Sequence, residues 1–181
     1  MLEALITSKT RIKLLMKFFL NSNSESYLRN LESEFGGSTN GIRQELNKFE
    51  SAGLLNSELK GNKKYFKANI SHPLFPDIHN LLIKHIGIDK IIDEVVDNIG
   101  TLYQVFLVGD FAKGIDNGLI DIVFVGDEIN KSYLLNLVEK AGKMVKRKIR
   151  YMLFTKEEII PYFSNKKDSD YLLIWEDGKL S

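Results

Sequence analysis

The 181-residue sequence contains no cysteine and no apolar run long enough to span a bilayer. The absence of cysteine excludes disulfides and thiolate metal sites, and it suits a cytoplasmic protein, which is the location we expect. The first residues lack a signal-peptide pattern, and we expect no contact with a membrane. The three histidines, at positions 72, 79 and 85, lack the His-x3-His spacing of a metal site, so no metal cluster is expected.

Charge is unevenly distributed along a chain whose net charge is only +1. Residues 1–70 hold 11 basic and 7 acidic side chains, whereas residues 71–181 hold 14 and 17. The front is therefore mildly basic and the back mildly acidic, which suggests separate partners. A hydrophobic content of 44% is sufficient for a packed core.

Apolar residues recur at helical spacing in three successive segments of the basic front. The first runs from Ile12 to Leu20 and the second covers residues 26–35. Gly36-Gly37 forms a tight turn, after which Ser38 caps a third helix that extends to about Ala52. Two helices joined by a short glycine-containing turn are typical of a helix-turn-helix.

A basic hairpin follows these helices. Segments 54–60 and 63–69 are strand-like and flank Gly61-Asn62, which predicts a β-hairpin. Three helices followed by such a hairpin indicate a winged helix. The runs Glu50-Ser-Ala-Gly-Leu-Leu and Gly61-Asn-Lys-Lys-Tyr-Phe-Lys-Ala-Asn resemble those of ArsR-type winged-helix regulators. The resemblance covers about residues 5–70 and implies DNA binding.

Two groups of polar residues are candidates for that contact. In a helix-turn-helix, the second helix enters the major groove with its N-terminal residues nearest the bases, where Arg reads guanine and Asn or Gln reads adenine. The outward positions of the third helix are Ser38, Thr39, Asn40, Arg43, Gln44 and Asn47. The candidates on the hairpin, or wing, are Lys60, Asn62, Lys63 and Lys64, whose lysines would contact phosphate. The alternatives are an ordinary solvated surface and a protein-binding module.

A helical connector separates the winged helix from the back of the chain. His72-Pro73 opens it, and Gly87 divides two amphipathic helical segments that end before Gly100. Strands mixed with helices follow, which indicates a small α/β domain with a mixed sheet. We therefore predict an α+β protein of two domains, with a winged helix over 1–70, a connector over 71–100 and an α/β domain over 101–181.

A Gly/Asp-rich connector lies between two apolar runs of the back domain, Val105–Val108 and Ile120–Val125. Both runs are short and rich in β-branched residues, which predicts two buried strands. Asp121 lies inside the second run. A carboxylate in that setting must be paired, protonated or bound to a ligand.

This stretch resembles the signature of the nucleotidyltransferase superfamily, with its polymerase-β-like fold. In that family a strand ends in Gly-Ser, and the next strand carries Asp-x-Asp. Gly109 matches the glycine and Asp121 the second aspartate, with Lys113 between them, but Asp110 replaces the serine and Leu119 the first aspartate. The order of winged helix, His-Pro-Leu-Phe-Pro, helix and this strand is similar to that of a group of bacterial and archaeal fusion regulators.

These departures predict a domain without catalytic activity and without a bound cofactor. The resemblance implies two aspartates on one strand face and a third carboxylate on a neighbouring strand, which together hold the divalent metals. Leu119 removes one of them, the segment 150–153 offers no acid, and Asp110 would repel a triphosphate. The alternative is a rearranged Mg²⁺ site built from Asp110, Asp116 and Asp121, in an active nucleotidyltransferase that modifies a protein or small molecule.

The sequence as a whole favours a transcriptional regulator. It would bind double-stranded DNA, as a homodimer that reads two half-sites. The back domain would sense a ligand, such as a nucleotide, or bind a protein. Another alternative is an antitoxin-like module that acts through protein interaction alone. For Asp121, salt bridges to Lys113 or to Arg150 both stay open.

Overall fold

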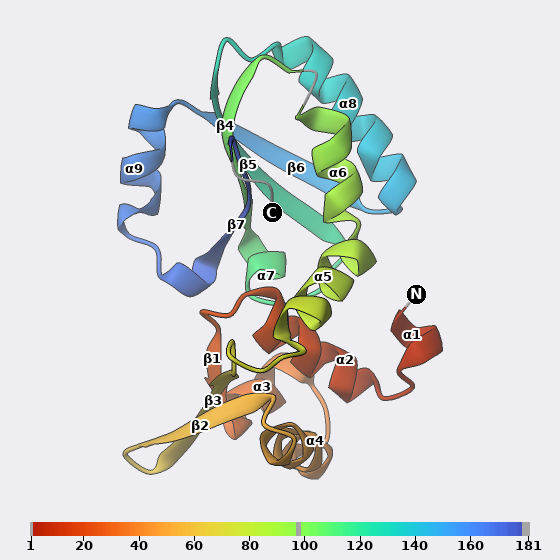
Figure 1. Cartoon of the computed structure of the whole chain (residues 1–181), viewed down its shortest axis with the longest axis vertical. Helices are drawn as coiled ribbons and strands as arrows, with labels where there is room; N and C mark the ends of the chain where they lie inside the picture. The colour runs from red at the N-terminus through yellow and green to blue at the C-terminus, as the bar shows by residue number, and fades with distance from the viewer. Residues whose placement is uncertain (1, 97–98, 179–181) are drawn as a thin grey trace. The chain divides into compact units, whose positions relative to one another are not determined.

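A computed structural model describes residues 2–96 and 99–178. The chain divides into two compact units, Met1–His85 and Ile86–Ser181 (Figure 1). The boundary lies inside the segment expected to be a connector. The predicted α+β class is confirmed, because each unit combines helices with a β-sheet. Among the described residues, no helix has both the length and the apolar character needed to cross a membrane.

The first unit contains the predicted helix-turn-helix and hairpin. Its elements are α1 (Leu2–Leu5), α2 (Lys9–Leu15), the π-helical turn η1 (Met16–Leu20), β1 (Glu25–Tyr27), α3 (Leu28–Phe35), α4 (Thr39–Ser51), β2 (Leu55–Lys60), β3 (Lys63–Ala68) and α5 (Phe75–Ile86), whose last residue belongs to the second unit. Ser8 and Ser38 cap α2 and α4 by accepting hydrogen bonds from the backbone N–H groups of Arg11 and Gly41. The side chains of Phe18, Phe19, Leu31, Ile42 and Leu46 form its buried core.

The sheet of the first unit has the order β1-β3-β2, and all its pairs are antiparallel. Lys60 and Lys63 are opposite each other at the tip of the β2–β3 hairpin, on either side of Gly61-Asn62. Gly61 has a φ of +64°, a conformation that glycine adopts without steric cost. Short β1, which was not predicted, pairs with β3 and turns the hairpin into a three-stranded sheet.

The second unit is a mixed four-stranded sheet with helices on its faces. Its elements are α6 (Ile88–Val95), β4 (Thr101–Val108), α7 (Gly109–Ala112), β5 (Leu119–Asp127), α8 (Lys131–Val145), β6 (Lys148–Phe154), α9 (Lys156–Ser164), the 3-10 turn η2 (Asp168–Asp170) and β7 (Tyr171–Glu176). The strand order is β6-β5-β4-β7, in which β5 and β6 are parallel and the other pairs are antiparallel. β6 and β7 are therefore the edge strands.

Alternate side chains of β5 face opposite sides of this sheet. Ile120, Ile122 and Phe124 are fully buried. On the alternate positions, Val123 and Val125 pack with Ile159 of α9, and aromatic side chains of the same helix extend this cluster. Helices α6 and α8 pack together away from α9 (Figure 1). Asp121 shares the face of Val123, so it lies on the side that α9 covers.

Helix α9 and strand β7 are each placed by local contacts. Thr155 caps α9 through a reciprocal pair of hydrogen bonds with Glu158, which is a capping box. At the far edge of the sheet, the half-buried Trp175 of β7 lies opposite Val105 of β4.

Candidate functional site

Helix α4 separates its apolar and polar side chains cleanly. Ile42, Leu46 and Phe49 are buried against the unit, whereas Asn40, Arg43, Gln44 and Asn47 are exposed, as is the capping residue Ser38. Thr39 is half-buried, and its hydroxyl donates a hydrogen bond to the Glu32 carboxylate. Five of the six predicted helix positions are thus exposed, and Thr39 instead ties α4 to α3.

A buried carboxylate anchors the same helix from behind. The Glu45 side chain is only 11% exposed, and its oxygens accept hydrogen bonds of 2.9 and 3.2 Å from Nε and Nη2 of Arg11 in α2. Hydrogen bonds from Arg11 hold the pKa of Glu45 below its usual value, while Glu45 raises the pKa of Arg11. This pair fixes α4 against α2 through charge-assisted hydrogen bonds.

The wing lysines differ in their partners. Lys60 Nζ lies 2.5 Å from Glu25 Oε1, and this contact raises the pKa of Lys60. Lys64 Nζ lies 2.7 Å from Glu50 Oε2. Lys63 Nζ lies 4.4 Å from the centre of the Tyr27 ring, and within the described ranges no carboxylate pairs with it. Of the three predicted wing lysines, Lys63 is therefore the one for which the described residues provide no counter-ion.

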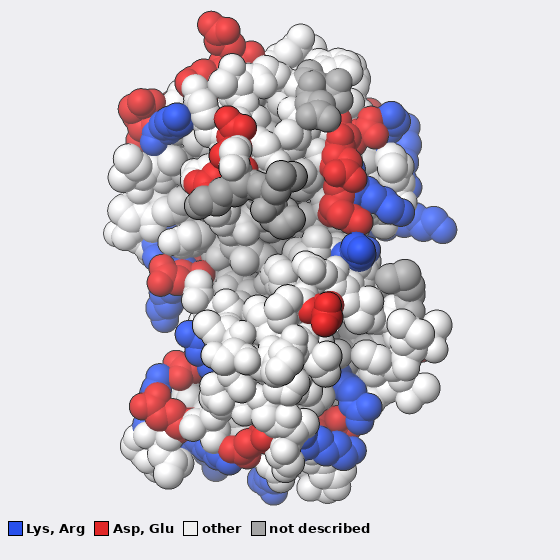
Figure 2. Space-filling view, in the orientation of Figure 1, with Lys and Arg blue, Asp and Glu red and all other residues white. Residues whose placement is uncertain are grey.

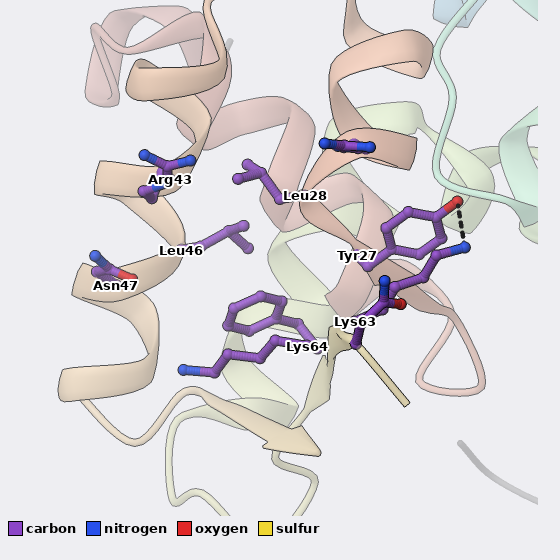
Figure 3. A pocket seen from close by; sticks show the side chains of 10 residues that line it. Tyr27, Leu28, Arg43, Leu46, Asn47, Lys63 and Lys64 are labelled. Atoms are coloured by element: carbon purple, nitrogen blue, oxygen red, sulfur yellow. Dashed lines mark hydrogen bonds between the residues drawn. The ribbon is translucent and has the colours of Figure 1, made fainter. Parts of the chain in front are cut away.

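A hollow of about 440 Å³ lies between α4 and the wing (Figure 3). Arg43 and Asn47 line it from α4, and Lys63 and Lys64 from the wing. In Figure 3, Lys64 points toward α4, whereas Lys63 turns to the Tyr27 hydroxyl, 3.4 Å away. Its other lining residues are Tyr27, Leu28, Arg29, Leu46, Asn62 and Phe66. Four cationic side chains line this hollow, of which Lys64 is paired with Glu50, and such a gathering of cations is suited to phosphate.

Two polar lining residues, Tyr27 and Arg29, were not predicted from the sequence. Arg29 lies in the first turn of α3, the helix that precedes α4. In a helix-turn-helix this first helix crosses the DNA backbone, so its position carried a usable signal. Tyr27 had none, because its place depends on the pairing of β1 with β3 across 38 residues of sequence.

In the second unit, Gly109 and Asp121 are brought into direct proximity. Gly109 begins α7 with a φ of +69°, and a Cβ atom there would lie 2.6 Å from Asp121 Oδ2. The Asp121 carboxylate accepts hydrogen bonds of 2.6 and 2.9 Å from Nε and Nη2 of Arg150. The two residues are direct partners in the parallel β5–β6 register. Of the two salt bridges left open for Asp121, the one to Arg150 is formed.

The other residues of the motif have partners of their own. Lys113 pairs with Asp170 at 3.3 Å. The exposed Asp110 accepts a hydrogen bond from Asn117 Nδ2, and Asp116 pairs bidentately with Arg147. Throughout the described ranges, no three His, Asp or Glu side chains gather where they could hold a metal ion. The structure therefore does not bring Asp110, Asp116 and Asp121 together as a rearranged metal site.

The Asp121–Arg150 pair lines another hollow, of about 350 Å³. Val108, Gly109, Tyr151 and Met152 complete its lining. Arg150 supplies the counter-charge that a carboxylate in this position requires. The pair raises the pKa of Arg150, first through the hydrogen bond and then through the charge of Asp121.

Comparison with known proteins gives partial structural likenesses. No protein-family profile and no curated protein matches the sequence. Reduced HlyU from Vibrio cholerae is 18% identical, with a TM-score of 0.36, and the match covers 46% of this chain and 82% of that one. A nucleotidyltransferase candidate from Sulfolobus solfataricus is 22% identical, with a TM-score of 0.38, and the match covers 55% of this chain and 85% of that one. A candidate transcriptional regulator for arsenical resistance is 24% identical, with a TM-score of 0.31, and the match covers 49% of this chain and 88% of that one. These values do not assign the chain to a family.

Proposed function

We propose that this protein is a DNA-binding transcriptional regulator. The observation that carries the proposal is the hollow between α4 and the wing, which gathers Arg29, Arg43, Lys63 and Lys64 beside two asparagines. Cations contact the phosphate backbone without regard to sequence, whereas exposed amide and guanidinium groups on a helix read base edges. Both kinds of group occur here on adjacent elements.

In this proposal, α4 enters the major groove and the wing follows the backbone. Arg43, Gln44 and Asn47 would read bases, since all three are exposed on the outer face of α4. Arg29 and Lys63 would bind phosphates on either side of the groove. Lys60 and Lys64 would first have to exchange Glu25 and Glu50 for phosphate oxygens.

The second unit would act as an interaction or ligand-sensing module. The pairing of Asp121 with Arg150 satisfies the carboxylate that would otherwise attract a metal ion. A homodimer would place two copies of α4 on the half-sites of a palindromic operator. Sedimentation equilibrium at several protein concentrations tests that stoichiometry directly.

Charge reversal on the wing tests DNA binding. We expect Lys63→Glu/Lys64→Glu to weaken binding to the chain's own upstream DNA and to lower the slope of log K against log salt by about 2, since each phosphate contact contributes about 0.9. Fluorescence anisotropy over a series of KCl concentrations measures both quantities. A matched control is Lys84→Glu/Lys90→Glu, because these lysines are exposed and lie outside the hollow. Wild-type affinity and slope in the wing variant would remove the wing from the interface.

A further inference from the structure

The second unit carries a basic surface where α8 ends and β6 begins. Five cationic side chains line a broad hollow of about 1060 Å³ there: Lys143, Lys146, Arg147, Lys148 and Arg150. Glu139 is the one acidic side chain among its lining residues. This surface, which we call the α8–β6 surface, stands out because this half of the chain has a net negative charge. Lys and Arg side chains are visible over α8 in Figure 2.

The backbone keeps the α8–β6 surface accessible. β6 is an edge strand, so no further strand covers its outer side. Lys143, Lys146, Lys148 and Arg150 are all exposed. Helix α8 ends at Lys146, which has a φ of +56°, a left-handed conformation that glycine usually occupies at this place. A lysine in this conformation is strained relative to glycine, and such strain is typical of functional positions.

The cations of the surface fall into two sets. Arg147 is held by Asp116, and Arg150 by Asp121. For Lys143, Lys146 and Lys148, the described residues provide no carboxylate within ion-pair distance, whereas Lys140 of the same helix pairs with Glu94. The negative end of the α8 dipole accounts for Lys143, in the last turn, but not for Lys148, which lies in the strand.

We propose that the α8–β6 surface binds the phosphate backbone of a nucleic acid through Lys143, Lys146 and Lys148. The planar fork of arginine matches carboxylate and phosphate alike, but both arginines here already hold carboxylates of the chain itself, which leaves the three lysines to bind an external anion. The unpaired cations are all lysines, which act as point charges suited to phosphate. The inference goes beyond the proposed function, since it gives the second unit a direct role in nucleic-acid binding.

The test neutralises the three lysines in the full-length protein. The variant is Lys143→Gln/Lys146→Asn/Lys148→Gln, in which asparagine is chosen because it tolerates the left-handed conformation at position 146. The control is Lys90→Gln/Lys131→Gln/Lys166→Gln, three exposed lysines of the same unit outside the α8–β6 surface. Circular dichroism checks that both variants fold. The probe is a labelled DNA duplex of mixed sequence, followed by anisotropy as KCl is raised.

We expect the triple variant to lower the slope of log K against log salt by about 2 to 3, while the control keeps the wild-type slope. The same comparison is repeated in the Lys63→Glu/Lys64→Glu background. If the triple variant lowers the slope in that background as well, nucleic-acid binding by the α8–β6 surface is supported. This holds even if the wing has no effect on binding and the proposed function fails. An unchanged slope in both backgrounds would overturn the inference. The inference would also be overturned if the triple variant lost binding to labelled polyglutamate but kept wild-type binding to the duplex, because the partner would then be an acidic protein.

Discussion

The ion pair between Arg11 and Glu45 allows a quantitative prediction about the first unit. Glu45→Gln keeps the shape of the side chain but removes its charge and one of its two acceptor oxygens, so Arg11 loses one of its two hydrogen bonds and its ion pair. A hydrogen bond to a charged group contributes roughly 1.5–3 kcal/mol. The Arg11 side chain is 39% exposed and can be hydrated again, which favours the lower end of that range. We expect the free energy of unfolding to fall by about 1–2 kcal/mol at pH 7.

The same pair fixes the direction of a pH dependence. The pKa of Glu45 in the folded protein lies below its ordinary value of 4.5, chiefly because of the hydrogen bonds from Arg11. Its contribution to stability is therefore complete above that ordinary value and disappears as the pH falls through the lowered pKa. Urea denaturation followed by far-UV circular dichroism should show a gap between wild type and Glu45→Gln that narrows on acidification. Glu58→Gln, on the exposed wing, is the control and should change stability little.

Two results would refute this reasoning. One is a loss of stability at pH 7 no larger than that of Glu58→Gln, which would mean that solvation of the separate charges offsets the pair. The other is a gap between wild type and Glu45→Gln that stays constant as the pH falls below the lowered pKa. The stabilisation would then not depend on the ionisation of Glu45.

Two further substitutions test the second unit. Gly109→Ala should destabilise it by about 1–3 kcal/mol in urea denaturation, because a Cβ atom at a φ of +69° is strained and would also displace Asp121. The control is Gly118→Ala, which tests the backbone strain alone, since Gly118 has a φ of +80° and no atom within 4 Å of an added Cβ. An equal loss of stability in the two variants would show that the contact with Asp121 costs nothing. Lys146→Gly should raise the free energy of unfolding by about 0.5–1 kcal/mol, because glycine adopts the left-handed conformation at position 146 without strain. The same variant should lower the slope of log K against log salt for DNA binding by about 1. Lower stability would indicate that the Lys146 side chain makes a stabilising contact.

Local patterns in the sequence predicted the secondary structure better than the contacts between elements. Gly61-Asn62 identified the wing, and the apolar run from Ile120 to Val125 identified β5, because turn chemistry and a short β-branched run depend on a few neighbouring residues. Strand β1 was missed, since three residues that pair with a strand far along the chain carry no periodic signal.

The candidate sites show the same division. Helical spacing indicated which residues of α4 would be exposed. It could not show that two of the wing lysines form ion pairs with Glu25 and Glu50. Likewise, Arg150 rather than Lys113 pairs with Asp121 because the parallel register of β5 and β6 sets them directly opposite. Sequence spacing alone does not determine register between strands that are separated by a helix.

Trp175 is the single tryptophan of the chain, and it lies in β7 of the second unit. The aromatic side chains of the first unit are phenylalanines and tyrosines, such as Tyr27 and Tyr65 near the wing. Selective excitation of tryptophan therefore reports on the second unit alone, whereas circular dichroism sums over both. The second unit thus carries an optical signature of its own without an added label, and Gly109→Ala should shift the tryptophan unfolding curve.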